Sequence, residues 1–364
     1  MRARDYGFIL GQLPPGPLNA ITDVAGVLVG HTTLIHGDGP LVPGQGPVRT
    51  GVTVILPHGG NLFREKVPAA VHTLNGFGKP FGFEQVRELG VLEAPIALTN
   101  TLNVGLVADA LVQHALQHSP EIGVTTASVN VVVGETNDGY LNDLQGRHVH
   151  AEHVFAALAA AAGGPVAEGN VGAGTGTSAL GWKGGLGTAS RVLPSWAGGF
   201  ILGALVQANF GAPGGLVIRG MPVGQLLRPP PAPAPGPGSI MIVLATDAPL
   251  DARQLGRLGP RAAVGLGRLG SVLDHGSGDF VIAFSTAERL PHSAPALTAP
   301  RAALADEARV MSALILAVVE CVEEAVLNAL CAAETMTGRD GHTSHALPAA
   351  RVAEMIRASN PSIR

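Results

Sequence analysis

The sequence predicts an α/β protein in which helices cover layered β-sheets. Strand-like runs of apolar, often β-branched residues alternate with helical patterns along the chain. With 364 residues, of which 46% are hydrophobic and 14% charged, the chain is long enough to bury a large core. A proline-glycine tract at 229–237 interrupts the alternation, but the segments on its two sides are each too incomplete to close a core alone. We therefore expect a single domain over residues 1–364.

The expected elements follow one another in mixed order. Strands are predicted where apolar residues run together, near 52–56, 95–99, 124–134, 199–207, 216–219, 239–246 and 279–285. Helices are predicted where apolar residues recur at helical spacing, near 104–117, 151–162, 251–268 and 304–334. In the last helix one face carries apolar residues such as Leu314 and Val318, and the glutamates fall mostly off that face, at Glu320, Glu323 and Glu324.

Composition excludes several classes of function. The formal net charge is −4 and no basic cluster is present, which argues against a nucleic-acid surface. Glutamates interrupt the most hydrophobic stretch, 313–333, so no membrane span is expected. The N-terminal segment lacks the apolar core of a secretion signal, and we expect a cytoplasmic protein. Lysine occurs only at Lys66, Lys79 and Lys183, so few residues could form a Schiff base. No cofactor is expected.

The junction Gly238-Ser239 is the most informative feature of the chain. The proline-rich tract before it cannot form a helix or an inner strand, because proline lacks an N–H and fixes φ. The run that begins at Ser239 is the opposite, a buried strand. Serine Oγ can attack the Gly238 carbonyl to give an ester by an N-to-O acyl shift, and water then frees a new α-amino group. An α-amine titrates near about 7.7–8.0, so it can act as general base for its own hydroxyl.

A second interpretation of this junction stays open. The pair Gly238-Ser239 could simply close a linker, since the chain contains 50 glycines. If the first interpretation holds, the precursor cleaves itself into residues 1–238 and 239–364.

Longer stretches of the sequence resemble a known family of enzymes. These are ITDVAGVLVGHTT (21–33), GETNDGYLND (134–143), GNVGAGTGT (169–177), LVQANFG (205–211), GSIMIVLATDAPL (238–250), GSGDFVIAFSTA (276–287) and GRDGHTSHALP (338–348). In this order and spacing they resemble the L-aminopeptidase/D-Ala-esterase/amidase family, which includes the β-peptidyl aminopeptidases. The resemblance covers residues 15 to 357 and implies an αββα sandwich, like that of N-terminal-nucleophile hydrolases, formed from a precursor that cleaves itself before a serine.

The resemblance also implies roles for single residues. Ser239 corresponds to the nucleophile, and Ser277 to a second serine that orients the nucleophile and its amine. Asp279 corresponds to an acidic residue two positions later, Asn209 to the oxyanion-hole asparagine, and Tyr140 to a tyrosine that faces the tetrahedral intermediate. Without the resemblance, a turn serine, a strand-end asparagine and a half-buried packing tyrosine would be ordinary interpretations of Ser277, Asn209 and Tyr140.

Glu135 is a candidate for binding the substrate ammonium. An aminopeptidase must favour a charged N-terminus, and a carboxylate in a pocket does so by a charge-assisted hydrogen bond. Asp138, in the same motif, could share this role, and a solvated strand-end glutamate is the alternative.

Two further patterns resemble a phosphate-binding loop and a zinc site. GNVGAGTGT lacks the ending of a P-loop and the spacing of a dinucleotide fold, so we expect a tight turn or a backbone-lined pocket wall. His148, His150 and His153 could bind zinc by spacing, but the resemblance assigns them no role and no metal is expected.

Three classes of function remain. We favour a self-processing serine aminopeptidase or amidase that releases N-terminal residues from small peptides, peptide amides or esters through an acyl-enzyme on Ser239. The alternatives are a self-cleaving acyltransferase of the ornithine-acetyltransferase type, whose known members cleave before threonine, and an uncleaved non-enzymatic or metal-binding protein. Partners other than small substrates are not expected, and the resemblance implies a homo-oligomer, a tetramer of cleaved pairs.

Overall fold

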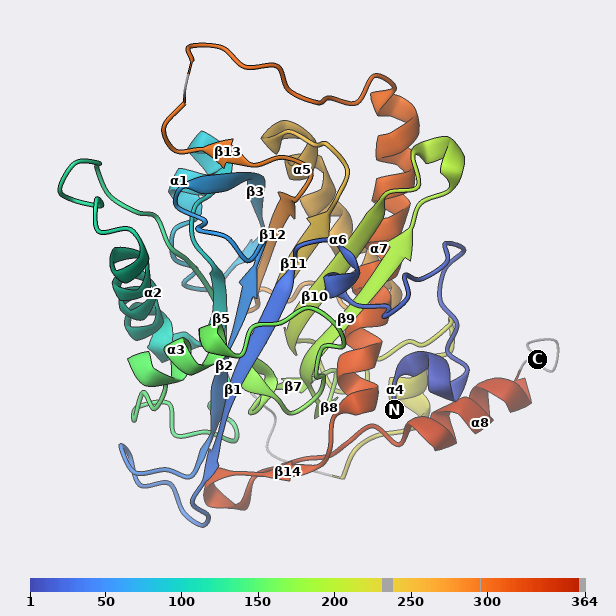
Figure 1. Ribbon diagram of the computed structural model, residues 1–364. Helices are drawn as coiled ribbons and strands as arrows, with labels where there is room; N and C mark the ends of the chain where they lie inside the picture. Colours follow the sequence, from blue (N-terminus) through green and yellow to red (C-terminus); the bar gives the residue numbers. More distant parts are fainter. Residues whose placement is uncertain (231–237, 295, 360–364) are drawn as a thin grey trace.

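Two stacked β-sheets form the centre of the molecule (Figure 1). The computed structural model describes residues 1–230, 238–294 and 296–359, so most of the proline-rich tract lies outside the described residues. The smaller sheet has the order β1-β2-β5-β6, with β1 Leu28–His36, β2 Val48–Leu56, β5 Ile96–Asn100 and β6 Val132–Thr136. The larger sheet has the order β13-β3-β12-β11-β10-β9, with β13 Leu290–Pro291, β3 Glu65–Gly76, β12 Gly278–Ser285, β11 Ser239–Thr246, β10 Ile201–Asn209 and β9 Gly185–Val192.

Short strands complete the β-structure. The strand β4 Val91–Leu92 pairs with β3, and two small hairpins pair β7 Ser178–Ala179 with β8 Trp182–Lys183 and β14 Met336–Thr337 with β15 Thr343–Ser344. In the two main sheets, β5 with β6 and β11 with β12 are parallel pairs, and the other neighbours run antiparallel.

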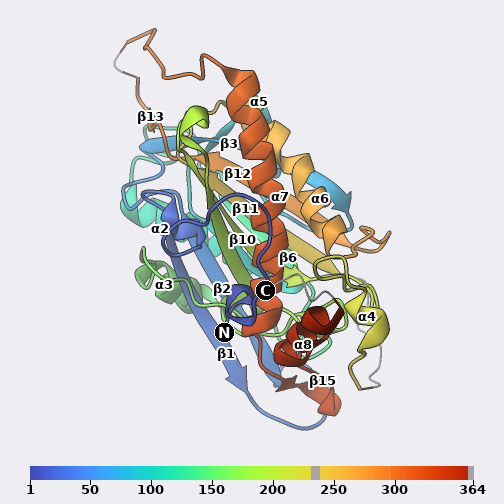
Figure 2. The same cartoon turned by 90° about the vertical axis from the view of Figure 1, so that its right-hand side faces the viewer.

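Helices cover the outer face of each sheet (Figures 1 and 2). The helices α2 Val104–His118 and α3 Ala151–Ala159 pack on the smaller sheet. The helices α5 Ala252–Leu258, α6 Ala262–Arg268 and α7 Glu307–Ala332 pack on the larger sheet. The remaining helices are α1 Phe83–Leu89, α4 Val223–Leu226 and α8 Ala349–Ser359.

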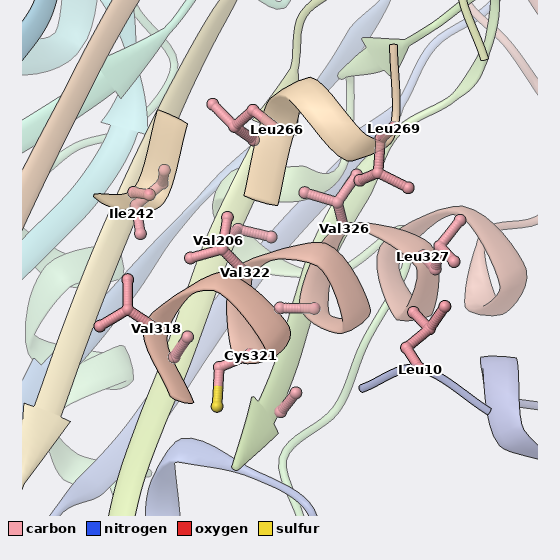
Figure 3. Packing of buried hydrophobic residues seen from close by; sticks show 14 of the residues in the cluster. Leu10, Val206, Ile242, Leu266, Leu269, Val318, Cys321, Val322, Val326 and Leu327 are labelled. Atoms are coloured by element: carbon pink, nitrogen blue, oxygen red, sulfur yellow. The ribbon is translucent and has the colours of Figure 1, made fainter. Parts of the chain in front are cut away.

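Alternation of side chains along β11 separates two buried layers. Met241 and Val243 point between the sheets, whereas Ile240, Ile242 and Leu244 belong to the cluster beneath α5, α6 and α7. Figure 3 shows Ile242 in that cluster with residues of β10 and α7. The layer order of helix, sheet, sheet and helix confirms the αββα sandwich that the sequence resemblance implied.

The glutamates of α7 are a departure from the expected amphipathic pattern. Glu320 and Glu324 are buried, and both bind the guanidinium of Arg191 on β9, at 2.9 and 2.6 Å. Arg4 of the N-terminal segment adds a second partner for Glu324. The ion pairs permit the helix to present carboxylates to the interior, which apolar periodicity alone does not predict. Among the described residues, no helix is long and apolar enough to cross a membrane.

Several predicted elements are wrong or shifted. The apolar run at 216–219 forms only an isolated bridge between Ile218 and Met221. The predicted strand at 124–134 begins only at Val132. The predicted helix at 251–268 is divided by a 3-10 turn at Gly259–Arg261, because proline at position 260 lacks the N–H that a continuous helix needs.

The strand order brings the ends of three strands together at one edge of the larger sheet. Ser239 begins β11, Asn209 ends the neighbouring β10, and Gly278 begins β12 on the other side. This edge carries the predicted site.

Candidate active site

The predicted nucleophile is the first residue of a central strand. Ser239 pairs in register with Asn209 on one side and with Gly278 on the other. By alternation with Met241, its side chain points between the two sheets, and the residue is buried. The amide N–H of Gly278 donates to the Gly238 carbonyl oxygen at 3.2 Å. The carbonyl before Ser239 is therefore held and polarised by a sheet hydrogen bond.

The side-chain amide of Asn209 has a defined orientation. The backbone N–H of Ser178 donates to Asn209 Oδ1 at 2.9 Å, and since an N–H can only donate, this contact identifies the oxygen. Asn209 Nδ2 then donates one hydrogen to the Asn137 carbonyl at 2.9 Å. An amide nitrogen carries two hydrogens, so a second donor remains for an oxygen at the site.

Ser277 and Asp279 form a hydrogen-bonded pair. Ser277 Oγ donates to Asp279 Oδ1 at 2.6 Å, and Asp279 Oδ2 is buried with no hydrogen-bond partner in the described part of the chain. Burial raises the pKa of Asp279 to about 6, against the opposing hydrogen bonds from Ser277 and the Ile240 N–H. Asp279 pairs in register with Ile240, so by alternation the carboxyl lies on the face of the sheet opposite to the Ser239 side chain. The pair therefore lies beside the main chain of β11.

Glu135 lies near the end of β6, in the sheet that faces Ser239. Its Oε1 accepts the backbone N–H of Lys79 at 2.9 Å, and the residue is only 2% exposed. Asp138 does not share this surrounding, because its carboxylate is bound by Thr50 Oγ1 at 2.5 Å and by Asn142 Nδ2 at 3.0 Å. Glu135 thus remains the candidate for the substrate ammonium, and Asp138 is engaged in the interior.

Tyr140 has a free hydroxyl and a packed ring. Its ring stacks on His342 with centroids 4.8 Å apart, and His342 Nδ1 lies 2.9 Å from the Tyr140 carbonyl oxygen. The hydroxyl is buried and has no hydrogen-bond partner among the described residues. Burial raises the pKa of Tyr140, so the hydroxyl is a proton-bearing donor at neutral pH.

A cavity of about 820 Å³ opens beside these residues. Asn209, Tyr140 and Gly238 line it, together with residues of the 211–213 turn, the 274–276 loop and the C-terminal segment that carries Arg339 and His342. Asn209 and Tyr140 thus face one space next to the Gly238-Ser239 peptide bond. Its volume suits a small ligand.

The zinc alternative finds no support in the side-chain arrangement. Within the part of the chain that the structure describes, no three histidine, cysteine or acidic side chains lie close enough to hold a metal ion. His148 instead contacts Asp143 at 2.9 Å.

Sequence reasoning missed one buried charge next to the site. Lys183 on β8 is fully buried, and its ammonium donates to the carbonyl oxygens of Gly174, Thr177 and Gly184. The glycine-rich stretch at 169–177 thus supplies carbonyls to a cation. Its resemblance motif marked the segment, but no side-chain pattern indicates a site built from backbone oxygens.

Comparison with known proteins identifies the family. A family model described as peptidase family S58 matches residues 19–344. The chain belongs to peptidase family S58. It is 43% identical to the β-peptidyl aminopeptidase BapA of Sphingosinicella xenopeptidilytica, over 99% of this chain and 92% of that protein. It is 30% identical to an uncharacterised aminopeptidase of Mycobacterium leprae, over 90% of this chain and 94% of that protein.

Solved structures of S58-like proteins share the whole fold. A β-aminopeptidase from Burkholderia sp. superposes with a TM-score of 0.91 at 45% identity, covering 98% of this chain and 99% of that chain. The L-aminopeptidase D-Ala-esterase/amidase of Ochrobactrum anthropi superposes with a TM-score of 0.89 at 42% identity, covering 98% of both chains. That enzyme is described as a prototype of the serine aminopeptidases and a variant of the Ntn hydrolase fold.

The S58 membership decides the class of activity. The chain is an aminopeptidase with the Ntn hydrolase fold, as the sequence analysis favoured, and the acyltransferase alternative is not supported.

Proposed function

We propose that the protein matures by cutting its own chain between Gly238 and Ser239 and then hydrolyses small peptides, amides or esters with Ser239 as an N-terminal nucleophile. The observation that supports this most is the position of the junction. Ser239 begins a central strand, and the carbonyl before it accepts the Gly278 N–H at 3.2 Å. That hydrogen bond makes the Gly238 carbon a better electrophile for the adjacent hydroxyl.

Maturation converts a peptide bond into an ester and then into two chain ends. Ser239 Oγ attacks the Gly238 carbonyl carbon, the C–N bond breaks, and the proton moves to the released amine. Water hydrolyses the ester and leaves a carboxylate on Gly238 and a free amine on Ser239. The amine is a main-chain group, and Asp279 lies beside the main chain of β11, with an Oδ2 that none of the described residues binds. Asp279 would become a charge partner of the new ammonium, with Ser277 fixing its orientation.

Hydrolysis uses the same hydroxyl on an external carbonyl. The Ser239 amine takes the hydroxyl proton, the hydroxyl forms the acyl-enzyme, and water releases the acid. The second N–H of Asn209 Nδ2 and the free Tyr140 hydroxyl would donate to the oxyanion, since both line the cavity. One such donor is typically worth about 3–4 kcal/mol in the transition state.

The substrate is a small molecule with a free N-terminal amine. Glu135 would hold that ammonium, and β-peptides are the first class to test because BapA, at 43% identity, is named a β-peptidyl aminopeptidase. A panel of chromogenic α-L-, α-D- and β-aminoacyl anilides separates the three stereochemical classes.

The working form would be a cytoplasmic homotetramer of cleaved pairs, as the family resemblance implies. Light scattering on the eluting peak after size exclusion measures the mass of the assembly. Cell fractionation with an antibody tests the compartment.

The proposed nucleophile is tested by two substitutions. Ser239→Ala should remain a single chain and hydrolyse nothing, because it has no oxygen to attack either carbonyl. Ser239→Cys should mature slowly, since a thiol can perform the same acyl shift. A Ser239→Ala protein that still cleaves itself or turns over anilides would refute the assignment.

A further inference from the structure

Lys183 is a buried cation that the proposed mechanism leaves without a role. The residue is 0% exposed, and its ammonium donates to three carbonyl oxygens, at 3.2 Å to Gly174, 2.7 Å to Thr177 and 2.9 Å to Gly184. A buried ammonium is costly unless its donors are used, and here all three hydrogens find acceptors. The site around Lys183 is thus fully built.

One of these carbonyls connects Lys183 to Asn209. The Thr177 carbonyl and the Ser178 N–H belong to the same planar peptide unit. Lys183 Nζ donates to the oxygen of this unit at 2.7 Å, and its N–H donates to Asn209 Oδ1 at 2.9 Å. A hydrogen-bond chain therefore runs from the ammonium through one peptide group to the side-chain amide of Asn209.

The direction of this chain is fixed. An ammonium only donates, so it draws electron density from the Thr177 carbonyl and makes the Ser178 N–H a stronger donor. A stronger hydrogen bond to Asn209 Oδ1 in turn makes Asn209 Nδ2 a stronger donor. Gly184 N–H also donates to the Thr177 oxygen at 3.1 Å and polarises the same peptide unit.

We propose that Lys183 is a positioning residue for hydrolysis, which orients and polarises the Asn209 amide toward the oxyanion through the Thr177–Ser178 peptide unit. The proposal rests on the proposed function of Asn209 as oxyanion donor. Lys183 does not touch the substrate, since it acts through two intervening groups.

Asp138, in the segment after β6, acts electrostatically on Lys183. Burial lowers the pKa of Lys183 to about 7 and raises the pKa of Asp138 to about 7, and the Coulombic attraction between the two groups acts against both shifts. Three carbonyl acceptors around Lys183 Nζ match the three hydrogens of an ammonium, whereas a neutral amine has two. Asp138 is itself held by Thr50 and Asn142, so the carboxylate that faces the ammonium is fixed in place.

A purely structural role is the competing account. Lys183 could only hold the loop at 174–184 together, in which case its loss would disturb stability and catalysis independently of Asn209. The two accounts differ in a double-mutant cycle, because residues that act through one another are not additive.

The test is the cycle of Lys183→Gln and Asn209→Ala, measured as kcat and KM on the matured fraction of each variant. Glutamine keeps hydrogen-bond donors for the loop but removes the charge. Lys183→Gln should lower kcat by about 10- to 100-fold with KM nearly unchanged, because the donor strength matters in the transition state. In the Asn209→Ala background the same change should lower kcat by less than about 3-fold.

The matched control removes a partly buried lysine that also forms an ion pair. Lys66 pairs with Glu93 away from the cavity, and Lys66→Gln should leave kcat unchanged. The proposal for Lys183 is overturned if Lys183→Gln lowers kcat equally in the wild-type and Asn209→Ala backgrounds, or if it does not lower kcat in the wild-type background. Either result leaves the role of Asn209 intact. Normal turnover by Asn209→Ala overturns the proposed oxyanion role, and the relay with it.

A second measurement applies if Lys183→Gln does not fold. Because the chain has only three lysines, ¹⁵Nζ-lysine labelling of the wild-type protein gives three signals, which Lys66→Arg and Lys79→Arg assign. A peptide boronate on Ser239 places a negative oxygen at the site. The Lys183 signal should then shift and the Lys66 signal should not. An unchanged Lys183 signal at saturation overturns the proposal.

Discussion

Glu135 is the residue that we propose selects substrates with a free amine. Its carboxylate is buried and accepts one backbone N–H, from Lys79, and among the residues that the structure describes it forms no ion pair. A buried carboxylate without a cation is costly. A substrate ammonium would supply the missing charge, which gives the free amine of the substrate a physical advantage over a blocked one.

Replacement of Glu135 by glutamine should therefore act on one class of substrate only. Glu135→Gln should reduce kcat/KM for free-amine anilides by about 10- to 100-fold, the usual worth of a charge-assisted hydrogen bond. Self-cleavage should proceed normally, because the precursor presents no ammonium there. N-acetylated anilides serve as the internal control, and identical activity of variant and wild type on both classes would contradict the role.

The sequence allowed the residues of the candidate site to be predicted, but not the hydrogen bonds between them. Ser239, Asn209 and Tyr140 stand in motifs that resemble a family. The structure places Ser239 beside Asn209 in the larger sheet, and Asn209 and Tyr140 line one cavity. The proposed role of Lys183 could not be predicted in this way, because its partners are backbone carbonyls that come together only when the loop folds. The position of Asp279, on the face of the sheet opposite to the Ser239 side chain, likewise depends on a strand register that the sequence does not specify.

At the scale of elements, β9 depends on a close approach to α7. A Cβ atom at Gly187 would overlap the Ala325 carbonyl oxygen, which belongs to the helix backbone and cannot rotate away. Glycine here thus sets the distance between helix and sheet. The sequence of β9, GLGTASRV, made the strand hard to predict, because two glycines and three polar residues leave no continuous apolar run.

Gly187→Ala should destabilise the protein by about 1–3 kcal/mol, the usual range for overpacking. The matched control is Gly105→Ala in α2, where the added Cβ meets no described atom within 4 Å apart from the backbone of its own helix. That change should be neutral or stabilise by up to about 1 kcal/mol, since alanine favours a helix. Urea unfolding measures both, and equal stability of the two variants would show that β9 and α7 can separate at no cost.

Elements were predicted best where the sequence contains a continuous run of apolar residues. Ser239–Thr246 was predicted with its observed bounds, because it is a continuous apolar run that is buried on both faces. The run at 216–219 carried a similar signal, but it lies between Gly214 and Gly220, both at positive φ, which turn the chain at each end.

At the scale of the whole molecule, an ionic network joins three distant segments. Arg191 lies between Glu320 and Glu324 of α7, and Arg4 brings the N-terminal segment to the carboxylate of Glu324. Burial raises the pKa of Glu324, but hydrogen bonding from Arg4 and the charge of Arg191 outweigh it, so the pKa lies below its usual value. The stabilisation is therefore present above the pKa of an unfolded glutamate and is lost as the pH falls through the lowered value.

Arg191→Met should destabilise the protein by about 3–5 kcal/mol, because it leaves two buried carboxylates without their shared cation. Arg253→Met is the control, since it removes an exposed partner of Glu307 and should change the unfolding midpoint little. Thermal unfolding at pH 7 compares the two. A midpoint for Arg191→Met equal to that of the control would mean that the network does not stabilise the fold.

The arrangement of the two sheets was predictable only through the resemblance. Apolar periodicity separates buried from exposed faces, and both faces of β11 are buried, so periodicity cannot tell a helix layer from a second sheet. The resemblance supplied the αββα order, and the register of β10, β11 and β12 then determined which residues meet.

Mass spectrometry of the purified wild-type protein tests the central claim most directly. Self-cleavage at Gly238-Ser239 predicts two chains, residues 1–238 and 239–364, whose masses sum to that of the 364-residue precursor plus one water. The two chains should remain associated under native conditions, because β11 lies between β10 of the first chain and β12 of the second. A single intact chain with aminopeptidase activity would contradict the claim, as would a second chain that has lost ammonia at Ser239.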